Sequence, residues 1–555
     1  MASVTHVSEK YSEFLNKVVK GGVRIPHFQR NFVWDMESSA KLIDSMIKGY
    51  PIGTFILWNT TEELRSVRSI GNLTFPEQRI GEPVYYILDG QQRITSFFAA
   101  INGAIVKREK SKEDDFSEIY IDLLATEDEE IVITEVAGRA EKSYIKINDL
   151  IHGTISFFMA FPSEYHDLLS AYKQNITSWQ FNITYLNDAA IDVATDVFTR
   201  LNVGGKTLTL FEIMVAKTYR AERVEVVGFD LLDKYNELVA ELMNSKYETI
   251  SNSTVLQVVS MLMVGGCTRN QILTLEKADF IAIWDKAMDA IKRTVDYFRT
   301  FGIPVSELLP YNALIVPFSY FFYKHPNKPV GIMQKRLEDF FWRCSLGGRY
   351  SSGVENKLAK DVSKIDRILG GELPYYEWRL NVDAEDLKLN GWFGTSRSFV
   401  KSILCLYVLQ KPKSFDNNYD VLIDNSWLKK STSKNYHHFF PKAYMKRTYL
   451  DMDYWRVNHI LNITIVDAYL NQRQIKDKAP KVYLGEIALH NEQLEETLRT
   501  HLIDLDGFGV KDNDYERFFA GRAELVSLEI KKRIIEQESG VENQAVNDES
   551  DEEEE

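Results

Sequence analysis

Cysteine is scarce in this sequence. Its 555 residues include three cysteines, Cys267, Cys344 and Cys405, which stand far apart along the chain. None belongs to a Cys-x-x-Cys pair, the spacing on which zinc sites and redox motifs depend. Disulfide-stabilised domains carry more cysteines in a shorter chain. The sequence therefore predicts neither a zinc site nor a disulfide framework, and it fits a reducing cytosol.

Long apolar runs, a signal peptide and a Walker A motif are missing as well. No segment reaches the ~18 apolar residues that a membrane-spanning helix needs. The first ten residues, M-A-S-V-T-H-V-S-E-K, lack the apolar core of a signal peptide. We therefore expect a cytoplasmic protein without a membrane partner. Because no Walker A pattern occurs, any nucleotide site must differ from a P-loop.

Positive charge is in deficit, since the formal net charge is −14. Such a balance is unfavourable for a partner with a phosphate backbone. Residues 536–555, however, contain ten acidic residues and no basic one, so most of the excess belongs to this end of the chain. We expect residues 539–555 to be a disordered acidic tail, because this composition cannot bury enough apolar surface to fold.

One segment reverses the sign of the charge. Between Trp427 and Leu450 there are six basic residues and no Asp or Glu. A basic cluster beside a hydrolytic site suits a DNA backbone, and a solvated loop is the alternative interpretation. The candidate DNA-binding residues are Lys429, Lys430, Lys434, Lys442, Lys446 and Arg447.

The same segment contains the motif H-H-F-F-P-K at 437–442, and N-I-T-I-V-D-A-Y-L-N follows at 462–471. Hydrolysis of a phosphodiester needs a general base that activates water and often a divalent metal ion that stabilises the phosphate. A pair of histidines with nearby asparagines supplies both kinds of group. An ordinary pair of surface histidines is the alternative.

This motif resembles the start of the HNH, or ββα-metal, nuclease fold. The resemblance implies that His438 is the general base and His437 a metal ligand. It also implies that Asn462 braces the catalytic loop and that Asn471 completes the metal site. The family more often has Asp or Glu before the base histidine. Because imidazole suits transition metals better than Mg²⁺, the choice between Mg²⁺ and Mn²⁺ stays open.

A second candidate site lies near the N-terminus. A predicted strand, Val84–Leu88, leads into D-G-Q-Q-R at 89–93 and then into a predicted helix at 94–101. The first amides of a helix are unpaired and attract anions, and Arg93 adds a guanidinium that can bind phosphate at two positions. In the alternative, Asp89 caps the helix and pairs with Arg93 without any ligand.

Two further motifs accompany D-G-Q-Q-R: I-P-H-F-Q-R-N-F-V-W at 25–34 and V-F-T-R-L-N-V-G-G-K-T-L-T-L-F-E at 197–212. In this order the three motifs resemble a ParB/sulfiredoxin-like domain. That domain forms the N-terminal half of GmrSD-type modification-dependent (type IV) restriction endonucleases, a family that includes SspE-like phosphorothioate-sensing defence proteins. The family also carries an HNH domain with an H-H-x-F-P-K motif, so the two resemblances support each other.

The resemblance implies that the N-terminal domain binds and hydrolyses a nucleoside triphosphate, GTP or ATP. Asp89 and Arg93 are the candidate catalytic residues for this turnover. For Arg30 and Arg200, a buried salt bridge is the alternative to contact with the ligand. The candidate nucleotide-binding residues are Gln29, Arg30, Asp89, Gly90, Gln91, Gln92, Arg93, Arg200 and Asn202.

The predicted fold class is α+β with several domains. Helical spacing predicts helices at 7–20, 231–243 and 277–298, and an apolar core helix or two at 150–169. The expected organisation is a ParB/sulfiredoxin-like α/β domain at 1–225, a helical connecting region at 226–380, an HNH (ββα-metal) domain at 381–510, a C-terminal helix at 511–538 and the tail at 539–555.

The first functional hypothesis is an anti-phage DNA endonuclease that senses a modified base or a phosphorothioate through its N-terminal NTPase domain and cleaves with a metal-dependent HNH site. The alternative is a nucleotide-dependent DNA-binding regulator with a degenerate HNH site, which His437 in the place of an acid favours. RNA is a further candidate substrate, because the scissile phosphate is common to both polymers. A homo-oligomer is compatible with either hypothesis.

Overall fold

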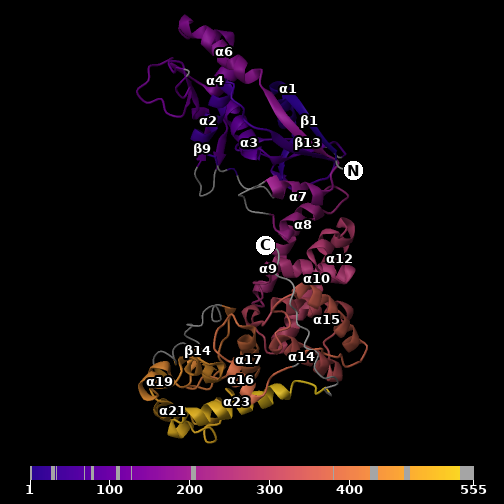
Figure 1. Cartoon of the computed structure of the whole chain (residues 1–555), viewed down its shortest axis with the longest axis vertical. Coiled ribbons are helices and arrows are strands. Elements are labelled where there is room, and N and C mark those ends of the chain that lie inside the picture. The colour runs from indigo at the N-terminus through magenta and orange to yellow at the C-terminus, as the bar shows by residue number, and fades with distance from the viewer. Residues whose placement is uncertain are drawn as a thin grey trace. The chain divides into compact units, whose positions relative to one another are not determined.

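The computed structural model describes residues 3–26, 32, 34–67, 69–76, 81–107, 113–126, 128–201, 208–378, 380–425, 436–467, 470 and 475–537 (Figure 1). The chain divides into two compact units, Met1–Lys234 and Tyr235–Glu555. Within these described ranges, no helix is both long and apolar enough to cross a membrane.

Unit 1 is built on a six-stranded mixed sheet with the order β1-β13-β3-β7-β2-β4. β13 pairs antiparallel with β1 and parallel with β3, while β7 pairs antiparallel with β3 and parallel with β2. The bounds of the strands are β1 Ser3–Lys10, β2 Val23–Pro26, β3 Phe55–Thr60, β4 Ser66–Val67, β7 Val84–Asp89 and β13 Gln180–Asn187.

Helices of unit 1 share one hydrophobic core with this sheet. Ile43 and Met46 of one helix and Ile94 and Phe98 of another are buried in it. The apolar spacing of both segments follows the 3.6-residue period of a helix, which turns these side chains to one face. The bounds of the helices are α1 Tyr11–Val19, α2 Met36–Ile47, α3 Gln91–Asn102, α4 Ile147–His152, α6 His166–Thr177, α7 Ile191–Leu201 and α8 Leu210–Thr218.

The first predicted helix is wrong in its N-terminal part. Residues 7–10 belong to β1, which lies beside β13 (Figure 1). The β-branched residues Val4, Thr5 and Val7 favour a strand, and the partner strand supplies the backbone hydrogen bonds that a helix would otherwise make. The helix itself begins at Tyr11.

The apolar segment 150–169, expected to form one or two core helices, is helical at both ends but broken in the middle. The chain forms two short helices, α4 and α5 (Ile155–Phe158), before α6 begins. Ile155, Phe157 and Met159 are exposed. The ends of the segment reach the core through Leu150 and Leu169, while its middle part lies at the surface of unit 1.

Unit 2 is largely helical, and the predicted helices at 231–243 and 277–298 are confirmed to within two residues. One core of aromatic side chains, among them Phe298, Phe318 and Phe341, joins the helices. The division between the two units falls within α9. The bounds are α9 Leu231–Met243, α10 Asn252–Val264, α12 Lys277–Thr300, α13 Ile315–Lys324, α14 Gly331–Leu346, α15 Val354–Leu369, α16 Ala384–Asn390 and α17 Ser398–Leu409.

The C-terminal part of unit 2 contains a small antiparallel hairpin of β14 and β15. Short helices follow each strand, and α23 packs against α16 and against the turn before β15 (Figure 1). The bounds are β14 Tyr436–His438, α19 Lys442–Thr448, α20 Tyr454–Val457, β15 Ile463–Ile465, α21 Pro480–Ala488 and α23 Tyr515–Lys531.

Candidate functional site: the β14–β15 hairpin and the N-terminal motifs

His438 ends β14 and is held by an asparagine. Its Nε2 lies 3.0 Å from Oδ1 of Asn458, on the segment that returns toward β15. An amide oxygen only accepts hydrogen bonds, so Nε2 carries the proton and Nδ1 keeps its lone pair. The arrangement leaves Nδ1 as the basic atom of this imidazole.

Burial keeps the His438 ring neutral. Loss of solvation, with a further contribution from the positive charge of Lys442, lowers the pKa of His438 to about 4, although the Asn458 hydrogen bond acts in the opposite direction. At neutral pH the imidazole is therefore unprotonated at Nδ1. A histidine in this state can accept a proton from water, which is the task of a general base.

Asn458 is a residue that the sequence analysis missed. Its side-chain amide also donates to the carbonyl of Phe393, 3.3 Å away, so it is fixed on two sides. The motif pattern centres on Asn462 and gives no weight to an asparagine four positions earlier. Only the return of the chain from α20 to β15 places Asn458 opposite His438.

Asn462 clamps the loop that follows β14. It is fully buried, and its amide oxygen accepts from the backbone N–H of Phe440 at 2.9 Å. Its amide nitrogen donates to the carbonyls of Phe440 and Val457, both at 3.0 Å. These three bonds to backbone tie the two sides of the hairpin together, so the side chain positions the loop and does not face a substrate.

His437 points to the opposite face of the strand from His438, because successive side chains of a strand alternate. It is buried against the rings of Phe415 and Tyr483, with centroid separations of 6.4 Å and 5.9 Å. Its Nδ1 lies 3.2 Å from the Thr464 hydroxyl. Burial lowers the pKa of His437 well below its ordinary value. The ring is therefore a neutral imidazole inside the molecule.

The fit of a metal ion rests on the other nitrogen of His437. Its Nε2 is buried and has no hydrogen-bond partner within the described part of the chain. An orphaned imidazole nitrogen suits a transition-metal ligand. The second expected ligand, Asn471, lies outside the described residues, and among those described there is no group of three or more His, Cys, Asp or Glu side chains that would hold a metal. The described residues alone thus do not make a metal site.

α23 forms a floor under the hairpin loop. The ring of Phe518 stacks on Phe439 at 4.9 Å, with an angle of 10° between the planes. Arg522 is fully buried and donates to the carbonyls of Leu461 and His501 at 2.7 Å and 2.9 Å. The candidate site therefore includes a helix that we expected to lie outside the nuclease region.

Three of the six candidate DNA-binding residues are described, all on α19. Lys442 lies 3.1 Å from the hydroxyl of Tyr454, and Lys446 is exposed. Arg447 forms an exposed ion pair with Asp477 at 3.1 Å. Lys429, Lys430 and Lys434 lie outside the described residues.

In unit 1 the Arg93 guanidinium is bound by the protein itself. It donates to the carbonyls of Ile52 at 2.8 Å and Thr54 at 3.1 Å, and it pairs with Asp89 at 2.8 Å. It also lies over the Phe55 ring, 4.9 Å from the centroid. The structure thus has the Asp89–Arg93 pair that the sequence left open as the alternative to phosphate contact.

Gly90 and Gln92 organise the start of α3. Gly90 precedes the helix with a φ of +96°, and a Cβ there would collide with the Phe55 ring, so glycine is required. The side-chain oxygen of the buried Gln92 accepts from the backbone N–H of Trp34 at 3.3 Å. This bond joins the motif at 25–34 to the D-G-Q-Q-R motif at 89–93. Gln91 is also buried at the start of α3. Gln29 and Arg30 lie outside the described residues.

Arg200 lies on α7, which packs against β7. It forms an ion pair with Asp196 at 2.9 Å, and 78% of its side chain is exposed. This local surface pair is neither a ligand pocket nor the buried salt bridge considered as the alternative. Asn202 lies outside the described residues.

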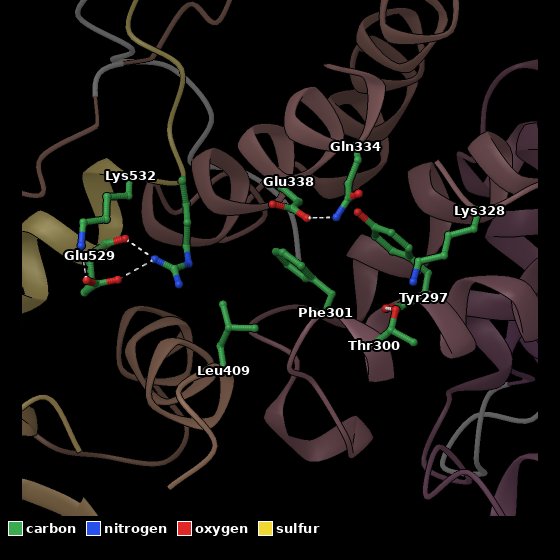
Figure 2. Close-up of a pocket in the computed structure, with 10 residues that line it drawn as sticks. Tyr297, Thr300, Phe301, Lys328, Gln334, Glu338, Leu409, Glu529 and Lys532 are labelled. Carbon is green, nitrogen blue, oxygen red and sulfur yellow. Dashed lines mark hydrogen bonds and ion pairs between the residues drawn. The ribbon is translucent and has the colours of Figure 1, made fainter. Parts of the chain in front are cut away.

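A cavity of about 560 Å³ lies in unit 2, away from the β14–β15 hairpin. Figure 2 shows Phe301 and Leu409 facing it, with Glu529 and Lys532 of the α23 end on one side. None of the predicted site residues lines it. The cavity is therefore separate from the hairpin site.

Comparison with known proteins assigns a relationship to unit 1. Over 616 aligned positions, the chain is 23% identical to Uncharacterized protein MJ0686 of Methanocaldococcus jannaschii, with 96% of this chain and all of that protein covered. Residues 11–219 match the family model described as GmrSD restriction endonuclease, N-terminal domain. Unit 1, with its three motifs, is thus similar to the N-terminal domain of the GmrSD restriction endonucleases.

Proposed function

We propose that this protein is a defence endonuclease that recognises modified DNA through unit 1 and cleaves it at the β14–β15 hairpin of unit 2. The similarity of residues 11–219 to a restriction endonuclease domain supports a nuclease with DNA as its partner. The observation that carries the proposal is the neutral His438, oriented by Asn458 at the end of a short antiparallel hairpin.

His438 acts as the general base in this proposal. Its Nδ1 takes a proton from a water molecule, and the resulting hydroxide attacks the phosphorus atom. The bond from phosphorus to one ester oxygen then breaks, and that oxygen takes a proton from solvent. Asn458 keeps Nε2 protonated throughout, and Asn462 holds the loop in place.

A divalent metal ion, Mg²⁺ or Mn²⁺, belongs to the proposal, with His437 and Asn471 as its ligands. When bound, such an ion stabilises the negative charge that develops on the phosphate. The metal assignment rests on the resemblance to HNH nucleases: the buried Nε2 of His437 has no hydrogen-bond partner among the described residues, but it lies on the face of β14 opposite His438. Isothermal titration of the full chain with Mn²⁺, compared with the His437→Ala variant, tests metal binding without any need for cleavage.

Unit 1 would sense the modification, a glucosylated hydroxymethylcytosine or a phosphorothioate, and couple recognition to turnover of GTP or ATP. The N-terminus of α3 beside Asp89 is the candidate phosphate position, because the positive end of the dipole of this 12-residue helix attracts an anion. Since Arg93 already bonds three protein groups, Asp89 is the better residue on which to test turnover.

The second candidate function is a nucleotide-dependent DNA-binding regulator without nuclease activity. The observation that favours it is the lack of a cluster of three or more metal-ligating side chains among the described residues. A regulator would bind DNA but would not respond to Mg²⁺ or Mn²⁺.

A cleavage assay separates the two functions. The full chain is incubated with plain, glucosyl-hydroxymethylated or phosphorothioate DNA, with Mg²⁺ or Mn²⁺ and with or without GTP or ATP. The His438→Ala and Asp89→Asn variants are compared, with Arg200→Ala as a matched surface control. We expect cutting of one modified DNA, loss of cutting in His438→Ala and loss of nucleotide turnover in Asp89→Asn.

Two results would contradict the proposal. If His438→Ala still cuts at the wild-type rate, the general base lies elsewhere. If no DNA is cut although nucleotide is hydrolysed, the regulator is the better description. Inclusion of single-stranded RNA of the same sequence shows whether RNA is also a substrate.

A further inference from the structure

Three exposed aromatic side chains lie on the segments that flank the His438–Asn458 pair. The exposed fractions are 53% for Trp392, 62% for Tyr454 and 40% for Trp455. Large aromatic side chains are normally buried where they only serve packing. A group of them beside a candidate catalytic residue therefore needs another explanation.

The backbone places Trp392 next to this pair. Trp392 forms an isolated antiparallel bridge with His459, and the N–H of Phe393 donates to the carbonyl of Asn458 at 2.9 Å. The amide of Asn458 donates back to the carbonyl of Phe393. Trp392 is therefore one residue from the segment that orients His438.

Tyr454 and Trp455 approach from α20. The ring of Trp455 lies 6.2 Å from that of His459, the residue that Trp392 pairs with. The Tyr454 ring lies under the ammonium group of Lys442, 5.3 Å from the centroid. Lys442 is close enough to His438 to lower its pKa. Trp392 and Trp455 thus share the neighbour His459, one position from Asn458, and Tyr454 shares Lys442 with His438.

The charges around these rings include both signs. Lys442 and Arg397 are basic, and the Arg397 guanidinium bonds the carbonyl of Trp392 at 2.6 Å. Asp453 is acidic, and its carboxylate accepts from the indole N–H of Trp455 at 3.3 Å. Phosphate attraction alone therefore does not explain the surface, whereas the flat faces of the rings suit nucleobases.

We propose that Trp392, Tyr454 and Trp455 form a stacking platform for unpaired nucleobases of a DNA strand, next to the phosphate presented to His438. The inference rests on the proposed nuclease function and adds a substrate class to it: DNA that is locally unpaired at the cleavage position. Bases in an intact duplex are stacked on each other, so their faces are not available to these rings.

The binding test uses the full chain with His438→Ala as the background, so that DNA stays intact. Fluorescence anisotropy gives the Kd for a labelled oligo(dT) strand, an abasic strand of the same length and a duplex. The abasic strand keeps the phosphates and lacks the bases. We expect Trp392→Ala and Trp455→Ala each to weaken oligo(dT) binding by about 5- to 150-fold, the range for one stacked base, and to leave abasic binding unchanged.

The control is Tyr419→Ala, which removes another exposed aromatic side chain of unit 2, away from the α20 segment. Trp392→Phe should keep most of the affinity, since it retains an aromatic face. Equal weakening of the abasic and oligo(dT) strands would overturn the platform, because it would indicate phosphate contact. Unchanged oligo(dT) binding in both Trp392→Ala and Trp455→Ala would overturn it as well.

Cleavage separates this inference from the proposed function. With His438 restored, a modified duplex with a short mismatched bubble should be cut faster than the perfect duplex, and Trp392→Ala should remove the difference. Cutting without any such preference refutes the platform and leaves the nuclease intact. Selective loss of oligo(dT) binding in a protein that cuts nothing supports the platform and refutes the nuclease.

Discussion

Three buried histidines and the half-buried His438 lie in and around the β14–β15 hairpin, and all are held neutral. Burial lowers the pKa of His438 to about 4 and that of His459 and His501 to about 3, and it lowers the pKa of His437 well below its ordinary value. His459 and His501 each bond a backbone carbonyl, of Lys388 at 3.1 Å and Lys413 at 2.7 Å. His459 and His501 therefore belong to the interior, whereas His438 and His437 are the proposed base and metal ligand.

The first prediction is that unit 2 loses stability at a pH that is still too high to protonate these histidines in the folded protein. The unfolded histidines titrate near a pKa of about 6.5, so between that pH and about 4 the unfolded chain binds more protons. The free energy of unfolding should fall as pH decreases, by up to about 1.4 kcal/mol per pH unit for each histidine. Urea titrations between pH 7.5 and about 4.5 measure this slope. His459→Gln should reduce the slope, and a slope that does not change would contradict the prediction.

The second prediction concerns the partner of His438. Asn458→Asp places a carboxylate at Nε2, which raises the pKa of His438 by favouring the charged ring. The acid limb of the cleavage rate should move to higher pH, while Asn458→Leu should lower kcat by about 10- to 100-fold with little change in KM. Asn417→Asp, on an exposed loop, is the control. An acid limb that stays in place would show that His438 is not the titrating base.

At the scale of single elements, the start of β3 depends on Arg93. Its guanidinium bonds two carbonyls, of Ile52 and Thr54, across a turn in which Gly53 has a φ of +84°. A Cβ at Gly53 would collide with the guanidinium of Arg93, so this position requires glycine. Arg93 therefore serves the fold of unit 1 whether or not a nucleotide binds nearby.

The third prediction follows from these bonds. Arg93→Ala should lower the free energy of unfolding of unit 1 by about 2–4 kcal/mol, because hydrogen bonds to a charged donor and to Asp89 are lost. Arg200→Ala, which removes an exposed i,i+4 pair, should cost less than about 0.5 kcal/mol. Urea unfolding followed by circular dichroism compares the two variants. Equal stability of both would show that the Arg93 bonds are dispensable.

Helices with long amphipathic patterns could be predicted from the sequence, and the bounds of α9 agree with the prediction. β1 could not, because its hydrogen-bond partners lie on β13, more than 170 residues later. The H-H-F-F-P-K pattern indicated His438. It could not indicate Asn458, because this residue lies opposite His438 only after α20 has turned the chain back toward β15. The partners of Arg93 are backbone carbonyls, which no side-chain motif records.

At the scale of the whole chain, the last described segment is fixed to the helices of unit 2. Beyond α23, the N–H of Ile535 donates to the buried carboxylate of Asp339 at 2.9 Å. The guanidinium of Arg343 bonds the Ile535 carbonyl at 2.6 Å and pairs with Asp339. This anchor lies immediately before the acidic residues at the end of the chain.

The fourth prediction compares two truncations. A chain that ends at residue 537 keeps α23 and its anchor, so it should unfold at the same urea concentration as the full chain and keep its cleavage activity. A chain that ends at residue 514 loses Phe518 and Arg522, so the loop around Asn462 loses its floor and activity should disappear. Activity and circular dichroism of both chains provide the measurement. Full activity in the shorter chain would show that α23 is not part of the site.

The position of α23 also has a consequence during translation. The ribosome makes the histidine motif more than 70 residues before it makes Phe518 and Arg522. A nascent chain, or one cut short by a premature stop codon, has the reactive side chains but not the helix on which their loop rests. Under the proposed function, the hairpin site would thus stay inert until α23 has been synthesised.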